Sequence, residues 1–163
     1  MKYVLVTGAC GGMGKSTVAA LKNAGYGVFA LDITECAAED GVIPIAADVT
    51  DEKAVADAAD KVRAVTDELF ALVHFAGVYA LDSFVEMPYE KLRKIFDINL
   101  FGAMLVNRTF LPFLKRGGKI VMTTSELAPL DPLPFTGIYA VTKGALDKYA
   151  YSLAMELQLL GIS

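Results

Sequence analysis

TGACGGMGKS, residues 7–16, follows directly on the first apolar run of the chain. This stretch can be interpreted in two ways. Its last three residues, Gly14-Lys15-Ser16, are those that close an ATP-binding P-loop, whereas Gly8, Gly12 and Gly14 are typical of a turn that holds a dinucleotide. Because the two loops belong to different folds and different chemistry, the rest of the sequence has to decide between them.

The P-loop interpretation fails on spacing. That loop has the form G-x-x-x-x-G-K-[ST], and its size fixes where the backbone amides point. Counting back from Gly14, the first glycine belongs at Ala9, and Gly8 lies one residue too far away. An ATP site also needs an acidic magnesium ligand after an apolar strand, but the later apolar runs end in VHFAG and VMTTS. A P-loop phosphotransferase is therefore disfavoured, and Lys15-Ser16 reads as a solvated first helical turn.

The dinucleotide interpretation fits better. Gly8 permits a tight turn, while Gly12, Met13 and Gly14 open a helix whose amides and positive dipole end suit a pyrophosphate. The spacing G-x-x-x-G-x-G nevertheless departs from the common G-x-G-x-x-G fingerprint.

Asp32 ends the second apolar run, where a carboxylate accepts hydrogen bonds from an adenosine ribose. Its charge would repel a 2′-phosphate, so NAD is favoured over NADP. The alternative is that Asp32 only caps a turn.

The composition is that of one soluble domain spanning residues 1–163. The chain is 55% hydrophobic with a net charge of −4 and no basic cluster, which argues against nucleic acid as a partner. The longest apolar stretch, residues 69–81, is too short to cross a membrane. No secretory leader is recognisable after Met1, so a cytoplasmic protein with Cys10 and Cys36 as reduced thiols is expected. A single histidine and the absence of a CxxC pair leave little for a metal site.

Apolar runs alternate with segments of helical periodicity. Strands are predicted at 2–7, 27–32, 42–47, 70–75 and 119–124, and helices at 12–25, 51–67 with Thr50 as N-cap, 88–115 and 137–160. This alternation predicts an α/β Rossmann-type fold, a doubly wound parallel sheet between two helical layers. Five strands are present, and the chain ends in QLLGIS before the sixth strand of the full form.

YAVTK places Tyr139 and Lys143 one helical turn apart on one face. A free tyrosine, with a pKa of about 10, is a poor base at neutral pH, but a neighbouring ammonium favours the phenolate and allows general acid–base chemistry. Ser125 closes the fifth strand at the edge where ligands bind. Asn99 has low helix propensity within a predicted helix.

At this point the sequence resembles the short-chain dehydrogenases/reductases of the Tyr-Lys subgroup. The resemblance runs from Lys2 to the end. The ordered motifs that carry it are TGACGGMG, Asp48-Val49, HFAG at 74–77, DINLFG around Asn99, TTS ending at Ser125, and YAVTK.

The resemblance implies an NAD-dependent oxidoreductase that interconverts a secondary alcohol and a ketone. Tyr139 would be the general acid and base, and Lys143 would favour its ionised form and bind the nicotinamide ribose. Ser125, chosen over Thr124, would hold the substrate oxygen, and Asn99 would support a proton-relaying water. The cofactor would contact Gly8, Gly12, Met13, Gly14, Asp32, Asp48, Val49, Ala76, Gly77, Tyr139 and Lys143. His74 stands where the family has Asn, and we interpret it as structural.

Family members continue past GIS with further strands and a substrate-binding segment. The resemblance therefore predicts an exposed sheet edge at the fifth strand and keeps open a non-catalytic dinucleotide-binding module. It also implies a homodimer or homotetramer formed through helices 88–115 and 137–160. The loop 126–136 is expected to border the pocket for a small alcohol or ketone.

Overall fold

The computed structural model describes residues 1–129 and 133–163 of the chain. Its centre is a five-stranded sheet, in which every pair of neighbouring strands is parallel and the order is β3-β2-β1-β4-β5. The strands are β1 (Tyr3–Thr7), β2 (Gly27–Asp32), β3 (Val42–Ala46), β4 (Leu69–His74) and β5 (Leu114–Met122). The order reverses at β1 and β4, and this switch point is where such sheets bind ligands.

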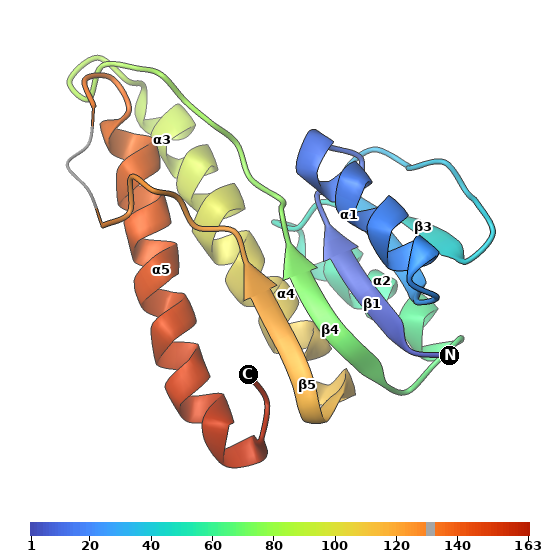
Figure 1. Cartoon of the computed structure of the whole chain (residues 1–163). Helices are drawn as coiled ribbons and strands as arrows, with labels where there is room; N and C mark the ends of the chain where they lie inside the picture. The colour runs from blue at the N-terminus through green and yellow to red at the C-terminus, as the bar shows by residue number, and fades with distance from the viewer. Residues whose placement is uncertain (130–132) are drawn as a thin grey trace.

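Helices cover both faces of this sheet (Figure 1). They are α1 (Gly12–Asn23), α2 (Glu52–Arg63), α3 (Tyr89–Phe96), α4 (Ala103–Phe110) and α5 (Gly137–Leu157). Alternate strand residues face opposite layers: Val4 and Val6 pack toward α1, whereas Leu5 packs in the cluster that contains residues of α2 and α4. The predicted three-layer Rossmann-type architecture is confirmed.

The helix predicted at 88–115 is in fact four segments. A π-helical segment, η1 (Asp97–Gly102), separates α3 from α4, and a 3₁₀ turn, η2 (Leu111–Phe113), follows α4. Pro112 explains the early end, because proline lacks an amide hydrogen and restricts the residue before it. A further 3₁₀ turn, η3 (Gln158–Leu160), closes α5.

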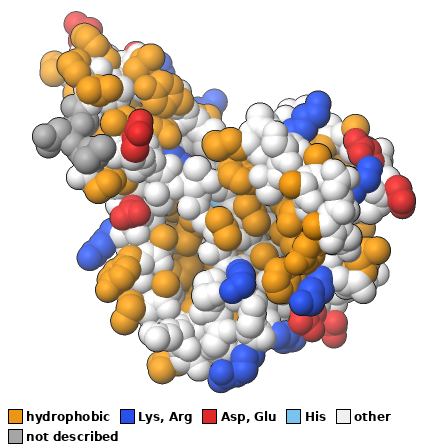
Figure 2. All heavy atoms as spheres, in the orientation of Figure 1, with side chains coloured by type: hydrophobic (Ala, Val, Ile, Leu, Met, Phe, Trp, Pro, Cys, Tyr) orange, Lys and Arg blue, Asp and Glu red, His pale blue; other side chains and the backbone are white. Residues whose placement is uncertain are grey.

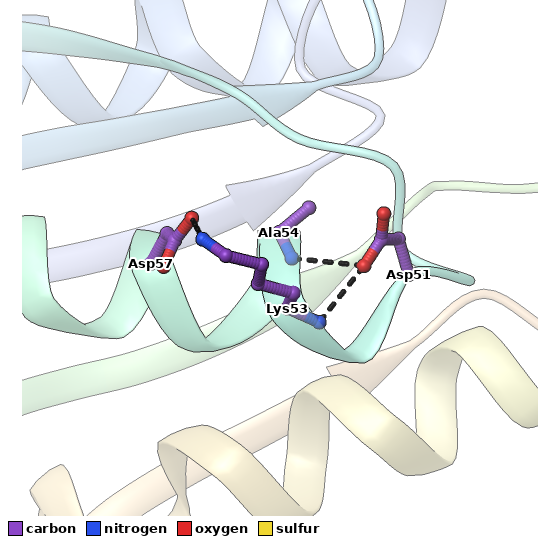
Figure 3. Close-up of polar contacts among 4 residues, drawn as sticks. All are labelled: Asp51, Lys53, Ala54 and Asp57. Atoms are coloured by element: carbon purple, nitrogen blue, oxygen red, sulfur yellow. Dashed lines mark hydrogen bonds and ion pairs between the residues drawn. The ribbon is translucent and has the colours of Figure 1, made fainter.

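The N-cap predicted for α2 is also wrong by one residue. Asp51, not Thr50, caps this helix, and its Oδ1 accepts hydrogen bonds from the amides of Lys53 (2.8 Å) and Ala54 (3.1 Å), as Figure 3 shows. Lys53 also pairs with Asp57 one turn later, at 2.6 Å. Thr50 is engaged instead by Asp48, whose Oδ1 accepts from its amide and hydroxyl, both at 2.8 Å. An aspartate one position later thus supplies the better acceptor geometry.

The edge of β5 is less exposed than predicted. The Ser163 amide donates to the carbonyl of Gly118 (3.1 Å), and the Ile120 amide donates to the carbonyl of Ser163 (2.8 Å). One residue bonded to positions i and i+2 of its neighbour is the pattern of a parallel strand. The exposed-edge prediction therefore applies to β5 beyond Ile120, where Val121 is 50% exposed.

The expectation of two reduced thiols is wrong: Cys10 and Cys36 form a disulfide. It joins the loop after β1 to the segment after β2, which are adjacent because β1 and β2 pair in parallel. Among the described residues, no helix has both the length and the apolar character needed to cross a membrane.

Candidate active site

The glycine-rich loop is held against the end of β4. Gly8 has φ +65°, a left-handed conformation, and a Cβ on it would lie 2.6 Å from the amide nitrogen of Ala76. A Cβ on Gly14 would lie 2.0 Å from the Gly8 carbonyl oxygen. These two glycines therefore permit close packing within the protein, whereas a Cβ on Gly12 would meet no protein atom within 4 Å.

The first turn of α1 is open to an anion. Its N-cap is Gly11, which has no side chain to accept from the first amides, and the turn contains no acidic residue. Uncapped amides and the positive end of the helix dipole bind phosphate groups. Together with the open side of Gly12, this arrangement fits a dinucleotide pyrophosphate.

A cavity of about 680 Å³ lies beside this loop. Six residues predicted to contact the cofactor line it: Gly8, Asp32, Asp48, Val49, Ala76 and Gly77. Five others predicted for the same role do not: Gly12, Met13, Gly14, Tyr139 and Lys143. Lys15 lines a different cavity of about 310 Å³ on the α1 side.

Several residues that line the cavity were not predicted from the sequence. Some are chain neighbours of predicted residues, such as Gly11, Ile33, Thr50 and Val78, and the motifs themselves could have indicated them. Others come from α3 and η1: Glu90, Arg93, Lys94, Asp97 and Ile98. Asp97 and Ile98 belong to the DINLFG motif, which could have indicated them. No sequence spacing indicates Glu90, Arg93 and Lys94, because their position depends on how α3 packs.

Asp32 lines the cavity and also closes a turn. Its Oδ2 accepts from the amide of Cys10 (3.0 Å) and its Oδ1 from the amide of Thr34 (3.2 Å). The two interpretations of Asp32 are therefore compatible, since a carboxylate has about four lone-pair sites and two main-chain bonds leave capacity for a ribose hydroxyl.

Lys143 and Tyr139 lie together on α5. The Lys143 ammonium donates to the carbonyl of Thr123 at 2.7 Å and lies 5.8 Å from the Tyr139 ring centroid. Burial lowers the pKa of Lys143, since a low-dielectric environment disfavours the charged form. The Tyr139 ring also packs edge-on against Tyr79, with centroids 4.7 Å apart.

Asn99 joins this cluster from the π-helical segment. It is buried, its Oδ1 accepts from the Val78 amide (2.7 Å), and its Nδ2 donates to the Val78 carbonyl (2.9 Å) and to Thr142 Oγ1 (3.1 Å). A Cβ on Gly77 would lie 3.3 Å from Asn99 Oδ1 and 3.7 Å from Lys143 Nζ. The loop after β4, η1 and α5 therefore meet at one point, and π-helical turns are frequent at functional sites.

Ser125 is placed near this cluster by the chain, two residues after Thr123. Its Oγ accepts from the amide of Leu127 at 3.2 Å, which leaves the hydroxyl hydrogen free to donate. The loop predicted to border the pocket is described except for residues 130–132, which lie outside the described residues.

His74 has a structural environment. It is buried, and its Nε2 lies 2.7 Å from Asn107 Oδ1, while Asn107 Nδ2 donates to the Tyr149 hydroxyl at 3.2 Å. These bonds connect β4 to α4 and α5. Burial lowers the pKa of His74 to about 4, against the weaker raising effect of the Asn107 hydrogen bond, so the imidazole is neutral at pH 7.

The sheet, its switch-point cavity and the glycine-rich loop define the class of a Rossmann-type dinucleotide-binding fold. The family model for short chain dehydrogenases matches residues 2–163. The chain therefore belongs to the short-chain dehydrogenase/reductase family of oxidoreductases.

Curated relatives include estradiol 17-beta-dehydrogenase 2 of Mus musculus, 34% identical over 99% of this chain and 45% of the relative. Another is the NADPH-dependent 1-acyldihydroxyacetone phosphate reductase of Schizosaccharomyces pombe, 28% identical over 99% of this chain and 56% of the relative. The chain thus spans about half the length of these two relatives.

Solved structures agree. A short-chain dehydrogenase from Streptomyces avermitilis is 30% identical and superimposes with a TM-score of 0.91, over 99% of this chain and 62% of that protein. A family member from Francisella tularensis, 26% identical, also reaches 0.91, over 99% and 66%.

Proposed function

We propose that the protein is an NAD(H)-dependent dehydrogenase that interconverts a secondary alcohol and a ketone, with Tyr139 as the general acid and base. The observation that carries this proposal is the meeting of Tyr139, Lys143 and Asn99 beside Gly77, a residue that also lines the large cavity. Gly77 thus borders both the proposed dinucleotide site and the proposed acid–base residues.

The cavity residues would hold the dinucleotide, with the first turn of α1 at the pyrophosphate and Asp32 at the adenosine ribose. A nicotinamide cofactor, when bound, supplies or accepts the hydride. The protein's part is the proton. Tyr139 would donate it to the ketone oxygen in reduction and remove it from the alcohol in oxidation.

Lys143 and Ser125 would assist Tyr139. Burial lowers the pKa of Lys143, which would ease passage of its own proton, and Lys143 would bind the nicotinamide ribose beside Tyr139. The Ser125 hydroxyl would donate to the substrate oxygen. Asn99, whose carboxamide is fixed by Val78 and Thr142, would hold the loop after β4 and η1 in place around a relaying water.

The preference for NAD over NADP rests on the charge of Asp32. Titration of NADH and NADPH, followed by cofactor fluorescence, tests it. NADH should bind more tightly, and Asp32→Ala should weaken NADH binding while narrowing the difference between the cofactors. Equal affinities in the wild-type protein would contradict the preference.

The substrate would approach from the side of Tyr79 and α5. Segments 82–84 and 135–137 meet there, because the Asp82 amide donates to the Phe135 carbonyl at 2.9 Å and Gly137 packs under the Phe84 ring. Exposed apolar side chains gather over this end of the molecule in Figure 2. The exposed apolar residues in and beside these segments are Tyr79, Leu81, Phe84, Val85, Leu133 and Phe135.

The deciding experiment follows NADH absorbance with a panel of secondary alcohols and ketones. Turnover that requires Tyr139 supports the proposal, whereas NADH binding without turnover on any member supports the alternative of a non-catalytic dinucleotide-binding module.

A homo-oligomer through α3–α4 and α5 is part of the proposal. Apolar side chains on these helices are exposed in the single chain: Phe101, Val141, Tyr151 and Met155. Light scattering should give a mass of two or four chains, and a strictly monomeric species would contradict this.

A further inference from the structure

The disulfide lies next to Asp32, the proposed adenosine end of the dinucleotide site, without lining the large cavity. Cys10 belongs to the glycine-rich loop, and Cys36 belongs to the segment between β2 and β3. Both cysteines line the smaller cavity on the α1 side, not the large one. The bond therefore lies outside the large cavity, but it joins two segments that each contribute residues to the wall of that cavity, Gly11 and Ile33.

Asp32 is held between these two segments. The Cys10 amide donates to one carboxylate oxygen and the Thr34 amide to the other. The orientation of the carboxylate therefore depends on the relative position of the glycine-rich loop and residues 33–34. Ile33 lines the large cavity and lies directly before Thr34. Its place in the cavity wall therefore depends on the same arrangement of the two segments.

Few other interactions hold the Cys36 segment. In the described part of the structure, residues 35–38 make no hydrogen bond and belong to no helix or strand. The disulfide and the partial packing of Cys36 against the core beside α1 restrain it from within, and the Lys22–Glu39 ion pair (2.7 Å) holds the residue that follows it. A segment with so few backbone bonds is of low local stability once its crosslink is removed.

We propose that the Cys10–Cys36 pair is a reversible redox site that sets the affinity for the dinucleotide, with the disulfide form binding more tightly. The inference rests on the proposed dinucleotide function. The disulfide fixes the loop and the 33–38 segment around Asp32 before the ligand arrives, and such preorganisation raises affinity by lowering the ordering cost of binding. Reduction releases the segment and loosens both donors to Asp32.

The reductant belongs to the class of dithiols. One thiolate of the dithiol attacks a cysteine sulfur, the Cys10–Cys36 bond breaks, and a mixed disulfide forms while the other cysteine leaves as a thiolate and takes a proton. The second thiolate of the dithiol then displaces the remaining cysteine. Two electrons and two protons pass to the protein, and the dithiol becomes a disulfide. Both cysteines are partly exposed, so the attack is sterically feasible.

The test uses the full chain, which contains two cysteines, so that dithiothreitol acts on this bond alone. NADH affinity is measured on the oxidised and the reduced wild-type protein, with the thiol state checked by alkylation. We expect the dissociation constant to rise about tenfold on reduction, within the range usual for coupled sites. Cys36→Ser should have the affinity of reduced wild-type protein and should not respond to dithiothreitol.

Linkage gives a second readout, because coupling between two binding equilibria is reciprocal. Saturating NADH should make the disulfide harder to reduce by the same factor, and a tenfold factor corresponds to a potential about 30 mV lower. Equal NADH affinity in both redox states would overturn the inference and leave the proposed function intact. Absence of NADH binding in both states would remove the dinucleotide site and the inference with it.

Discussion

The proposed dinucleotide side and the proposed catalytic side of this molecule are built differently. The dinucleotide side combines a cavity with a glycine-rich turn, and the features of this turn are those of the backbone: a left-handed Gly8, close packing at Gly14 and uncapped amides at the start of α1. The catalytic side is formed by side chains on η1 and α5, and exposed apolar residues surround it. Backbone construction makes the first side recognisable from glycine spacing, whereas the second depends on how helices pack.

The largest expected effect is that of Tyr139→Phe, which should lower turnover on the catalytic side far more than NADH affinity on the dinucleotide side. Tyr139→Phe removes the proton that the reaction needs, so turnover should fall by about 10³-fold, within the usual range for general acid–base catalysis. Because Tyr139 does not line the large cavity, NADH affinity should change by less than about tenfold, the size of one hydrogen bond. Stopped-flow turnover and NADH fluorescence measure the two quantities.

Tyr151→Phe is the matched control, since Tyr151 lies on the same helix, is 63% exposed in the single chain and keeps its apolar ring in the variant. It should leave both quantities unchanged. Retained turnover in Tyr139→Phe would contradict the assignment of the acid.

The next effect concerns β4, which contributes to both sides. His74, at the end of this strand, has its pKa lowered to about 4 by burial. Between pH 6.5 and 4 the unfolded chain therefore binds a proton that the folded protein does not. The free energy of unfolding should decrease as the pH is lowered through this window. The full loss is about 3 kcal/mol and levels off below pH 4.

Denaturant unfolding of wild-type protein and His74→Asn at several pH values measures this contribution. The amide side chain does not titrate, and it retains the ability to hydrogen-bond Asn107. The difference between the two curves isolates His74 from the carboxylates. Parallel curves between pH 4 and 6.5 would mean that His74 is accessible to protons in the folded protein.

The comparison also explains what the sequence could predict. Alternating apolar runs and helical periodicity predict the parallel sheet, because they reflect local burial at each strand and helix. The motif residues Gly8, Asp32 and Gly77 line the cavity, since each lies at or shortly after the carboxyl end of a strand. Pro112 was a usable indication that the helix ends early.

Other features depend on contacts distant in sequence. The π-helical turn around Asn99 forms where Asn99 bonds to Val78 and Thr142, and no residue pattern encodes those partners. The disulfide joins residues 26 positions apart, and their proximity follows from strand pairing. Residues of α3 line the cavity because of the way this helix packs, which also depends on contacts distant in sequence.

Two glycines, Gly12 and Gly14, test the role of the backbone on the dinucleotide side. A methyl group on Gly12 meets no protein atom, whereas one on Gly14 would meet the Gly8 carbonyl. Gly12→Ala should keep or slightly raise thermal stability, since alanine favours helix, but it should weaken NADH about tenfold by approaching the pyrophosphate. Gly14→Ala should lower the free energy of unfolding by about 1–3 kcal/mol through overpacking and lose binding as a consequence.

Thermal melts and NADH titrations on both variants distinguish a ligand-facing glycine from a packing glycine. Unchanged NADH affinity in Gly12→Ala would place the pyrophosphate elsewhere.

The smallest expected effect concerns Lys15, the residue that made a P-loop conceivable. Lys15 lines the smaller cavity together with Cys10 and Lys22, whereas Asp32 and Gly77 line the large cavity. Because its ammonium is exposed there, Lys15→Ala in the oxidised protein should change NADH affinity by less than about twofold, since an exposed charge outside the binding surface contributes little. Isothermal titration at low and moderate salt separates direct contact from general attraction, which salt screens. A loss of tenfold or more that persists in salt would mean that the Lys15 ammonium reaches the phosphates, and that α1 presents a different face to the dinucleotide than the one on which Gly12 is open.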